Sequence, residues 1–469
     1  MDENGLPYKE YINIDSDHIW HPYTQEKTAK RNLLVKRAFK EFIEVIDENG
    51  NETQIIDAVS SWWVNIHGHC HPFIQEKIKE QLSEHEQVIF AGFTHEPAVK
   101  LIKNLLAFLP QKDLFTDRKL TKAFFSDNGS TSVEVAIKMA IQFFYNRNAP
   151  KKKRIIAFSD AYHGDTVGTM STGATDTFHH AFKSILFPVD RVESPASLLA
   201  KEEPFARDQA YAEEKALRQL VKLIETSPKE HAAVIIEPLV QAAGGMRFHS
   251  VEFLQKIREV CNHFDIFLIA DEVFTGFGRT GTNFACEQAQ IVPDMICLSK
   301  GLTGGFMPMG LTVTTQEVYE AFYDDSRLKT FFHGHSYTGN SLACTAALAS
   351  LELYQKENRL EDVQFLNIKM QEVLASEEMK SLRVIRDIRC LGAIGVIEFE
   401  TTAQHEYLAS IGPRIYEHFL EKGILMRPLG NVLYFMPPYN ISLESLKYCL
   451  NTIKNFCLDL EKSALLSSR

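Results

Sequence analysis

A lysine and an aspartate each end a run of apolar residues. Lys300 closes "DMICLSK" and precedes "GLTGG", and Asp271 closes "IFLIAD" 29 residues earlier, about one strand–helix–strand unit. In open α/β sheets, ligands bind beyond the carboxyl ends of the strands, where a partly desolvated lysine can act as an imine-forming nucleophile. A carboxylate on the next strand suits pyridoxal phosphate, because it keeps the pyridine nitrogen protonated. The pair predicts such a site, although a lone lysine at a strand end is usually just solvated.

The phosphate of that cofactor needs backbone donors. The stretch "SDNGSTSVE" joins a strand to a helix through Gly129, Ser130 and Thr131, and Thr131 with Glu134 forms a T-x-x-E capping box. Free N–H groups and the helix dipole attract an anion at such a start. The three residues are therefore candidate phosphate ligands, and a plain capped helix is the alternative.

Two polar loops supply further candidates. In "AYHGDT", Tyr162 has a ring that can stack on a pyridine, and we place it with Lys300 and Asp271 in the catalytic set. His163 and Asp165 in the same loop are candidate pocket groups. The glycine-rich "HGHSYTGN" precedes a long helix and offers Ser336 as a phosphate donor. The alternative is that both are ordinary polar loops.

Three other patterns invite a functional interpretation. "GFGRTG" (276–281) matches the dinucleotide pattern, but no good helix begins at its last glycine, which disfavours that site. "HGHCH" (67–71) has metal-capable side chains but no second ligand cluster at zinc-like spacing, so a turn is favoured. Before it stand Trp62 and Trp63, which form either a pocket wall or part of the core.

The elements that must position these residues alternate between strands and helices. Near-continuous apolar runs separated by helical periodicity are typical of a mainly parallel sheet covered on both faces. The expected strands cover 123–127, 154–160, 233–238, 266–273 and 294–301, and the expected helices include 128–145, 251–264 and 341–357.

The chain is expected to divide into three parts. An N-terminal segment of residues 1–75 contributes to the small domain and the substrate pocket, 76–345 form the large cofactor-binding domain, and 346–469 form a smaller α+β domain. Within the large domain, 196–231 are charged and form an excursion with a surface helix. In the last part, strands are expected within 384–400 and 423–438, with a turn at Gly430–Asn431.

Composition limits the class of protein. The 469 residues are 45% hydrophobic and carry a formal net charge of −11, which argues against nucleic-acid and anionic-membrane partners. The polar start lacks the pattern of a signal peptide, and no apolar run is long enough for a bilayer span. Eight scattered cysteines without a short-spaced framework suit reduced thiols. A cytoplasmic α/β enzyme is expected.

Taken together, these residues resemble the class III pyridoxal-phosphate aminotransferases of fold type I over nearly the whole chain. The order of "LIADEVFTGFGRTG", "LSKGLTGG" and "HGHSYTGN" carries the resemblance. It implies pyridoxal phosphate held by Lys300, with Asp271 at the pyridine nitrogen, Gly129 and Ser130 at the phosphate and Tyr162 over the ring. It also implies a homodimer with shared active sites, in which Ser336 reaches the phosphate bound by the other subunit.

Within the class, "HIWHPYTQ", "SSWWVNIHGH", "AYHGDT" and "MRPLGNVLYFMPPY" resemble the branch that serves biotin biosynthesis. The implied reaction moves an amino group from S-adenosylmethionine to 8-amino-7-oxononanoate, giving 7,8-diaminononanoate. The implied substrate contacts are Tyr23, Trp62, Trp63, Tyr162, Lys300, Gly334 and Arg427, with Arg427 pairing with the substrate carboxylate and Arg279 a further polar group nearby. Leu429 stands where parts of this branch carry an aromatic residue.

Four alternatives stay open at this point. Some members of the branch use lysine as the donor, although Tyr23 in place of phenylalanine favours S-adenosylmethionine. Another class III enzyme acting on an ω-amino acid, such as ornithine or 4-aminobutyrate, is the near alternative. A nicotinamide-dependent dehydrogenase using "GFGRTG" is more distant, because that motif lacks its helix. A non-catalytic binding protein is the most distant, because it would not need both Lys300 and Asp271.

Overall fold

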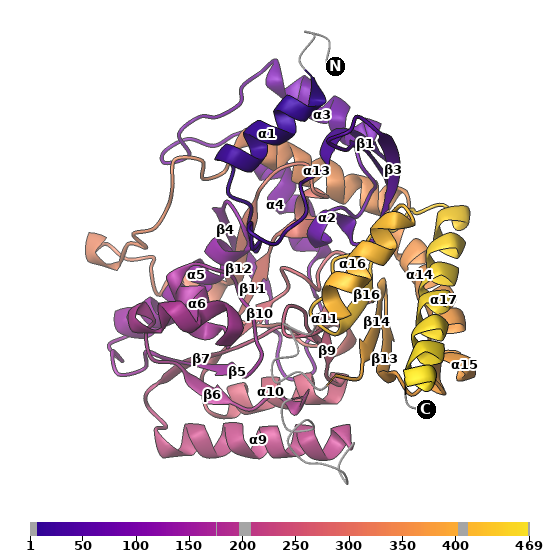
Figure 1. Ribbon diagram of the computed structural model, residues 1–469. Coiled ribbons are helices and arrows are strands. Elements are labelled where there is room, and N and C mark those ends of the chain that lie inside the picture. Colours follow the sequence, from indigo (N-terminus) through magenta and orange to yellow (C-terminus); the bar gives the residue numbers. More distant parts are fainter. Residues whose placement is uncertain (1–6, 175, 197–207, 402–410, 468–469) are drawn as a thin grey trace.

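A computed structural model describes residues 7–174, 176–196, 208–401 and 411–467. Its centre is a seven-stranded sheet (Figure 1). β12 pairs antiparallel with both of its neighbours, and the other paired strands run parallel. The predicted mainly parallel α/β sheet is therefore confirmed. In spatial order the strands are β4 (Leu120–Ser126), β12 (Gly310–Thr315), β11 (Met295–Leu298), β10 (Phe267–Asp271), β7 (His231–Ile236), β5 (Arg154–Phe158) and β6 (Asp190–Val192).

The central strands are apolar at almost every position because both faces of the sheet are covered. Alternate side chains of each strand point to opposite faces. Ile269 on β10 belongs to the cluster under helix α5 (Gly129–Asn146), whereas Leu268 and Ala270 belong to the cluster under α10 (Val251–His263). A two-sided core of this kind holds the carboxyl ends of the strands in one rigid row.

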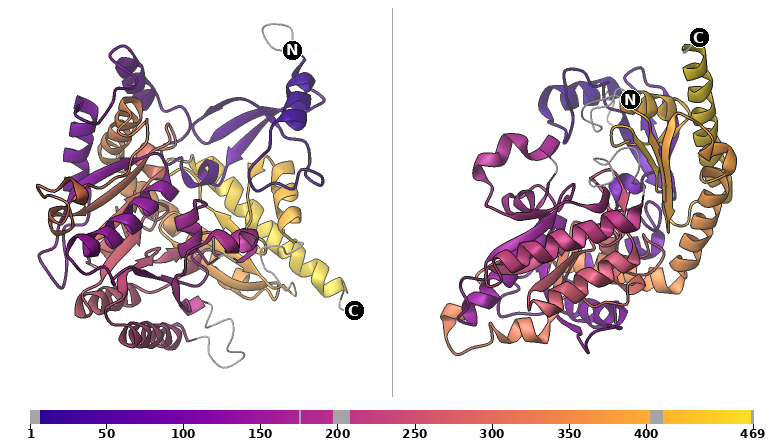
Figure 2. Two further views of the ribbon diagram at one scale, coloured as in Figure 1. Left: turned by 90° about the vertical axis from the view of Figure 1, so that its left-hand side faces the viewer. Right: turned by 90° about the horizontal axis from the view of Figure 1, so that it is seen from below.

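The first part of the chain forms a separate, smaller sheet. β1 (Leu34–Phe39), β2 (Phe42–Ile46) and β3 (Glu52–Asp57) make an antiparallel meander, and β15 (Ile424–Leu425) joins β3 in parallel. A strand from the last third of the chain thus completes a sheet begun near its start. Figure 2 shows the indigo N-terminal strands on the same side of the molecule as the yellow C-terminal helices.

A three-stranded sheet forms the other part of the C-terminal third. It consists of β13 (Ile385–Leu391), β14 (Ile394–Phe399) and β16 (Val432–Phe435). Helix α14 (Arg359–Leu374) packs against this sheet, and α17 (Leu443–Ser467) lies beside α14 (Figure 1). The turn at Gly430–Asn431 is confirmed, and Leu429 forms a bridge with Val432 across it.

The strands expected within 384–400 and 423–438 are confirmed. The first run forms β13 and β14, and the second contributes β15 and β16, which belong to different sheets. The residues between them leave the first sheet before the turn, so the short bridge at Leu429 is the one place where the segment pairs with itself. Hydrophobic runs show that strands exist but not which sheet each one joins.

The remaining elements connect and cover these sheets. In the excursion expected at 196–231, residues 197–207 lie outside the described residues, and α9 (Gln209–Thr226) is the helix expected there. Within the described ranges, no helix has the length and apolar character needed to cross a membrane. The other elements are α1 (Tyr8–His18), α2 (Ser60–Trp63), α3 (Pro72–Leu82), α4 (Glu96–Phe108), α6 (Val167–Thr172), α7 (Asp176–His179), η1 (His180–Ile185), β8 (Val240–Gln241), β9 (Arg247–Phe248), α11 (Ala285–Gln288), η2 (Lys300–Thr303), α12 (Gln316–Glu320), η3 (Arg327–Lys329), α13 (Ser341–Lys356), α15 (Glu377–Lys380) and α16 (Ile411–Glu421).

Candidate active site

Charged side chains gather at the carboxyl ends of three adjacent strands. Asp271 is the last residue of β10, Glu237 directly follows β7, and Lys300 follows β11 after Ser299. Because β7, β10 and β11 are neighbouring parallel strands, their ends lie at one edge of the sheet. The predicted pair of Lys300 and Asp271 is thus brought together, with Glu237 as a third member.

Asp271 is buried and paired. His163 Nδ1 lies 2.7 Å from Asp271 Oδ2, and the backbone N–H of Val273 donates to Oδ1 at 3.2 Å. His163 is buried as well, and a carboxylate–imidazole hydrogen bond holds both groups in place. The carboxylate of Asp271 is therefore held in a fixed position at the end of β10.

Lys300 lies in an apolar environment. Its Nζ is 4.4 Å from the centre of the Trp63 ring and 5.4 Å from that of Phe274. Burial lowers the pKa of Lys300 to about 8, against the attraction of Asp271 and Glu237, which favours the charged form. Among the described residues, Nζ has no hydrogen-bond or ion-pair partner. A lysine of this kind is a good nucleophile and proton carrier near neutral pH.

Glu237 was not among the sequence candidates. Burial raises its pKa to about 7, although His163 and the N–H groups of Tyr162 and Ala242 favour its charged form. Its sequence signal was available, since Glu237 ends the apolar run "AVIIE" just as Asp271 ends "IFLIAD". The same rule that found Asp271 would have found it.

The start of α5 has the predicted strand–turn–helix form, but its cap is different. The N-cap is Asn128, whose side chain accepts from Thr131 N at 2.9 Å, while Thr131 Oγ1 accepts from Asn128 N at 3.1 Å. The expected box of Thr131 with Glu134 is therefore wrong. Glu134 instead accepts from Gly168 N and Thr166 Oγ1, both at 2.6 Å, because the loop after β5 lies within reach.

Two glycines allow close packing of neighbouring side chains at this helix start. A Cβ on Gly129 would lie 2.7 Å from Val273 Cγ1, and one on Gly164 would lie 1.9 Å from Ser130 Oγ. The N–H of Asp165 also donates to Ser130 Oγ at 3.2 Å. The start of α5 is thus packed against the loops that follow β5 and β10.

Tyr162 and Asp165 form a hydrogen-bonded group with Tyr23. Tyr23 OH donates to Asp165 Oδ2 at 2.6 Å, Tyr162 OH donates to the same oxygen at 2.9 Å, and the two phenol oxygens are 3.2 Å apart. Burial raises the pKa of Tyr162 far above its usual value. For Asp165, burial works toward a higher pKa, but hydrogen bonds from His179 and the two tyrosines lower it overall. This group ties the N-terminal segment to the loop after β5.

The tryptophan pair lies on one turn of left-handed helix. Ser60, Ser61, Trp62 and Trp63 have φ values of 51°, 45°, 67° and 76°, and Trp63 N and Val64 N donate to Val59 O and Ser60 O at 3.0 and 2.9 Å. Left-handed backbone costs about 1–2 kcal/mol for each non-glycine residue. Four such residues in succession persist only where their surroundings hold them.

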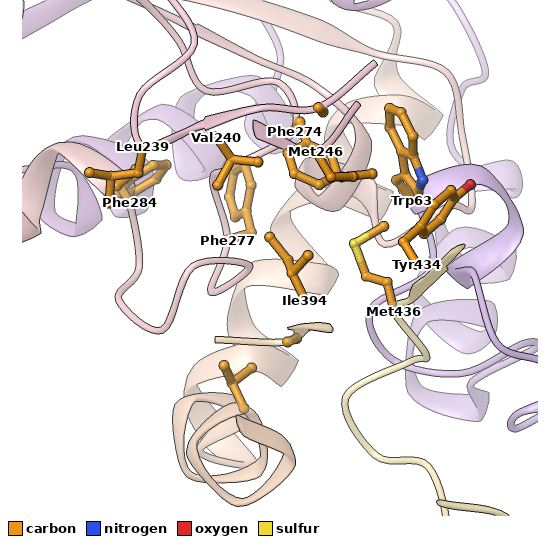
Figure 3. Close-up of a cluster of buried hydrophobic side chains, with 14 of the residues drawn as sticks. Trp63, Leu239, Val240, Met246, Phe274, Phe277, Phe284, Ile394, Tyr434 and Met436 are labelled. Carbon is orange, nitrogen blue, oxygen red and sulfur yellow. The ribbon is translucent and has the colours of Figure 1, made fainter. Parts of the chain in front are cut away.

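The two tryptophans have different environments. Trp63 is 5% exposed and packs against Phe274 and Tyr434, inside the buried cluster of Figure 3. Trp62 is 38% exposed and meets Tyr23 edge-on, with ring centres 5.7 Å apart. The pocket-wall interpretation therefore fits Trp62, and Trp63 is a core residue that also contacts Lys300.

Two arginines flank this turn. The guanidinium of Arg427 lies 4.5 Å from the centre of the Trp62 ring, and no acidic side chain in the described part of the chain pairs with it. Arg279 is buried, its Nη2 donates to Trp63 O at 3.2 Å, and desolvation lowers its pKa. Leu429 lies partly buried against the main core. Arg427 is thus the cation available to a ligand beside Trp62.

Segment 333–340 is not brought to this cluster within one chain. Gly334 and Ser336 are exposed, and Ser336 O accepts from Gln87 Nε2 at 3.0 Å. The described contacts of the segment do not include Lys300 or Asp271. The role of Ser336 toward another subunit therefore stays a prediction.

The histidines of "HGHCH" each have a structural partner. His67 Nε2 lies 3.0 Å from Ser350 Oγ, His69 Nε2 lies 3.0 Å from Asp57 Oδ2, and His71 Nδ1 accepts from Phe73 N at the start of α3. The segment is a turn leading into α3, as predicted. "GFGRTG" is likewise a turn with no helix at its last glycine.

A family model for class III aminotransferases matches residues 23–457. The adenosylmethionine-8-amino-7-oxononanoate aminotransferase of Synechococcus elongatus is 44% identical over 92% of this chain and 96% of its own. The enzyme of that name from Geobacter sulfurreducens is 40% identical over 94% and 95% of the two chains. Both alignments are close to full length.

Solved structures are similar over the same extent. The adenosylmethionine-8-amino-7-oxononanoate aminotransferase of Methanocaldococcus jannaschii superposes with a TM-score of 0.85 at 34% identity, covering 96% of this chain and 99% of that one. An amine transaminase from an uncultivated Pseudomonas species, solved in its PLP-bound form, gives 0.84 at 27% identity, covering 93% and 97%. This chain belongs to the class III aminotransferase family and is an aminotransferase.

Proposed function

We propose that this aminotransferase transfers an amino group from S-adenosylmethionine to 8-amino-7-oxononanoate, giving 7,8-diaminononanoate in biotin biosynthesis. The observation that carries the proposal is the near-full-length likeness to relatives that bear this activity in their names, at up to 44% identity. The arrangement of Tyr23 and Arg427 around Trp62, which directly precedes the Trp63 that contacts Lys300, supports the same substrate. We also propose that the enzyme works in the cytoplasm, in keeping with its scattered, unpaired cysteines.

The residues present fit pyridoxal phosphate. Lys300 is a partly buried, unpaired amine with a pKa of about 8, and Asp271 is a buried carboxylate held by His163. A Cβ on Gly129 would clash with Val273, so this glycine allows a close backbone approach at the start of α5. Lys300 would hold the cofactor's aldehyde carbon, Asp271 its ring nitrogen, and Gly129, Ser130 and Thr131 its phosphate.

Pyridoxal phosphate, when bound, supplies a carbonyl that carries amino groups and a ring that withdraws electrons. Once the donor's amine has displaced it, Lys300 Nζ would take the proton from the donor's Cα, and in the second half of the reaction it would deliver a proton to the carbon that receives the amino group; a pKa near working pH suits both roles. Asp271 would hold a negative charge against the protonated ring nitrogen. Tyr162 would cover the ring, with its hydroxyl oriented by Asp165.

The acceptor is a nine-carbon keto acid with a long aliphatic stem and one terminal carboxylate. A flat apolar surface and a single cation recognise such a molecule. Trp62 supplies the surface, and Arg427, whose guanidinium lies over that ring, supplies the cation. Tyr23 bounds the same space through its edge-on contact with Trp62. Trp63 contributes through its contact with Lys300.

We further propose that two copies form a homodimer with shared active sites. Gly334 and Ser336 then serve the site of the other subunit, Ser336 at the phosphate and Gly334 at the substrate. In support, the same region of the chain exposes the large apolar side chains of Leu328, Phe332 and Tyr337, which an interface would cover.

The three-part division of the chain is also a proposal. It assigns 1–75 to an N-terminal segment, 76–345 to the large domain and 346–469 to the small domain. The pairing of β3 with β15 supports grouping the first part with the last, and the seven-stranded sheet draws all its strands from the middle part.

A visible absorption spectrum of the purified protein, recorded before and after adding donor, tests the function. We expect an absorption band from lysine-bound pyridoxal phosphate that bleaches with S-adenosylmethionine, followed by formation of 7,8-diaminononanoate when the keto acid is added. Bleaching only with lysine would change the donor, and bleaching only with ornithine or 4-aminobutyrate would change the substrate class. A protein that gives no band after incubation with pyridoxal phosphate would contradict the proposal.

A further inference from the structure

We propose that Asp57 is a positioning residue for substrate selection, acting through the left-handed turn Ser60–Trp63. The inference rests on the proposed function of the site, and it adds a residue that contacts neither substrate nor cofactor. Asp57 is the last residue of β3 and is completely buried. Its carboxylate determines where the side chains of Trp62 and Trp63 point.

The carboxylate of Asp57 has four hydrogen-bond partners. Oδ1 accepts from the backbone N–H groups of Val59 and Ser61 at 3.2 and 2.9 Å. Oδ2 accepts from Ser61 Oγ at 2.8 Å and lies 3.0 Å from His69 Nε2. A buried carboxylate needs such donors to remain charged. Three of the four bonds go to the turn or to the residue just before it.

These bonds explain why the turn is left-handed. The four residues Ser60–Trp63 carry side chains, and L-residues with side chains avoid φ values of 45° to 76°. The turn's own backbone bonds are those any helical turn makes, so they do not select its hand. Asp57 selects it by drawing the N–H groups of Val59 and Ser61 toward one carboxylate oxygen.

Both ends of the turn are also held by other segments. At its last residue, Arg279 Nη2 donates to Trp63 O at 3.2 Å, and at its first residue, Ser60 Oγ donates to Met436 O at 2.8 Å. The turn is therefore attached to β3, to the loop after β10 and to the segment after β16. Among these side chains, Asp57 makes the most hydrogen bonds to the turn and the residue before it.

The left-handed backbone of the turn directs the adjacent side chains of Trp62 and Trp63 into different environments. Trp63 enters the core beside Lys300, while Trp62 lies between Tyr23 and Arg427. The described contacts of Asp57 do not include Tyr23, Arg427 or Lys300. If the turn relaxed toward right-handed backbone, Trp62 would leave the guanidinium it lies under. Selection of the long keto acid would then suffer more than attachment of the cofactor.

The test compares Asp57→Asn and Asp57→Ala with Asp47→Asn. Asp47 is a matched control because its carboxylate also accepts from two backbone N–H groups, those of Asn49 and Asn51, in the turn between β2 and β3. All variants are made in a Trp20→Phe background, so that the remaining tryptophans both belong to the left-handed turn. Trp20 is 89% exposed, so this background leaves the core intact.

The first readout is near-ultraviolet circular dichroism and tryptophan fluorescence, which need no substrate. Asp57→Ala should change both signals, and Asp57→Asn, which keeps one acceptor oxygen, should change them less. The second readout is kinetic. In Asp57→Asn we expect kcat/KM for 8-amino-7-oxononanoate to fall by about tenfold or more, chiefly through KM, since misplaced binding groups cost factors of this order.

The outcomes separate this inference from the proposed function. Wild-type tryptophan signals together with wild-type kcat/KM in both Asp57 variants would overturn the inference, as would equal losses in Asp47→Asn. If Asp57→Ala does not fold, Asp57→Asn and Ser61→Ala provide the same readouts. If the wild-type protein aminates a different acceptor, the proposed function fails, and the tryptophan signals still decide whether Asp57 holds the turn.

Discussion

Two regions of this enzyme meet at Lys300, and they are built in different ways. The row of Glu237, Asp271 and Lys300 lies at the ends of three adjacent parallel strands buried on both faces. The turn that carries Trp62 and Trp63 is held by a few hydrogen bonds of the Asp57, Ser60 and Arg279 side chains, and its backbone is left-handed. Rigid regular structure positions the groups that carry out the chemistry, and an unfavourable backbone held by its neighbours positions the groups that select the substrate.

The difference suggests how selectivity can vary while chemistry stays the same. Residues at the strand ends cannot move without disturbing a core that spans the whole sheet. A left-handed turn can move when one side chain that holds it changes, because its own backbone does not favour it. Substitutions in the first region should therefore remove activity, and those in the second should change which substrate is used.

The largest effect is expected at Lys300. Lys300→Ala removes both the nucleophile and the proton carrier, so turnover should fall by at least about 10⁴-fold. Steady-state turnover and the visible spectrum measure this together. Lys79→Ala, which removes an exposed lysine on α3, is the control and should retain full activity. Turnover in Lys300→Ala near the wild-type rate would place the chemistry elsewhere.

The two tryptophans provide the next test, because they are neighbours in the two different environments. Trp63→Ala should lower the free energy of unfolding by about 3–5 kcal/mol, since it empties a buried site. Trp62→Ala should lower it by about 1 kcal/mol or less and mainly raise KM for the keto acid. Urea unfolding midpoints and acceptor kinetics measure the contrast. Equal destabilisation by the two substitutions would remove the distinction between core and pocket wall.

Substitution of Arg427 should have a smaller effect, confined to the binding of the keto acid. Arg427→Ala should lower kcat/KM for 8-amino-7-oxononanoate by about 10- to 100-fold, because a hydrogen bond to a charged group is lost. The visible absorption of the bound cofactor should not change. Arg427→Lys, which keeps the charge but not the planar fork, should be intermediate. A spectral change of the same size as in Lys300→Ala would mean that this region positions the cofactor too.

The smallest expected effect is a shift, toward lower pH, in the pH dependence of cofactor capture by Lys300. Because burial lowers the pKa of Lys300 to about 8, its amine becomes neutral and nucleophilic at lower pH than an exposed lysine, whose pKa is 10.5. The rate at which apoenzyme captures pyridoxal phosphate should rise with pH and level off above about pH 8. Stopped-flow absorbance follows this rate. A rate that keeps rising until pH 10 would show that Lys300 is exposed to water when the site is empty.

The sequence by itself determined the parts that depend on local pattern. Apolar runs ending in Asp271 and near Lys300 were enough to place both residues at strand ends, because parallel strands align their carboxyl ends at one edge. The same reasoning located the start of α5 and the turn at Gly430–Asn431. Motif order, compared with a known family, supplied the reaction class, and the family model and relatives confirmed it.

Only the tertiary structure decided how distant segments meet. His163 and Asp271 are 108 residues apart, and β3 pairs with β15 across most of the chain, so no local pattern indicates either contact. Sequence spacing favoured Thr131 with Glu134, but in the fold Glu134 binds the loop after β5. The tertiary structure also places the side chains of two adjacent residues differently. Trp62 and Trp63 have different environments because Asp57 holds their backbone in a conformation that neither residue prefers. Local preference decides which elements form, and long-range contacts decide where each side chain points.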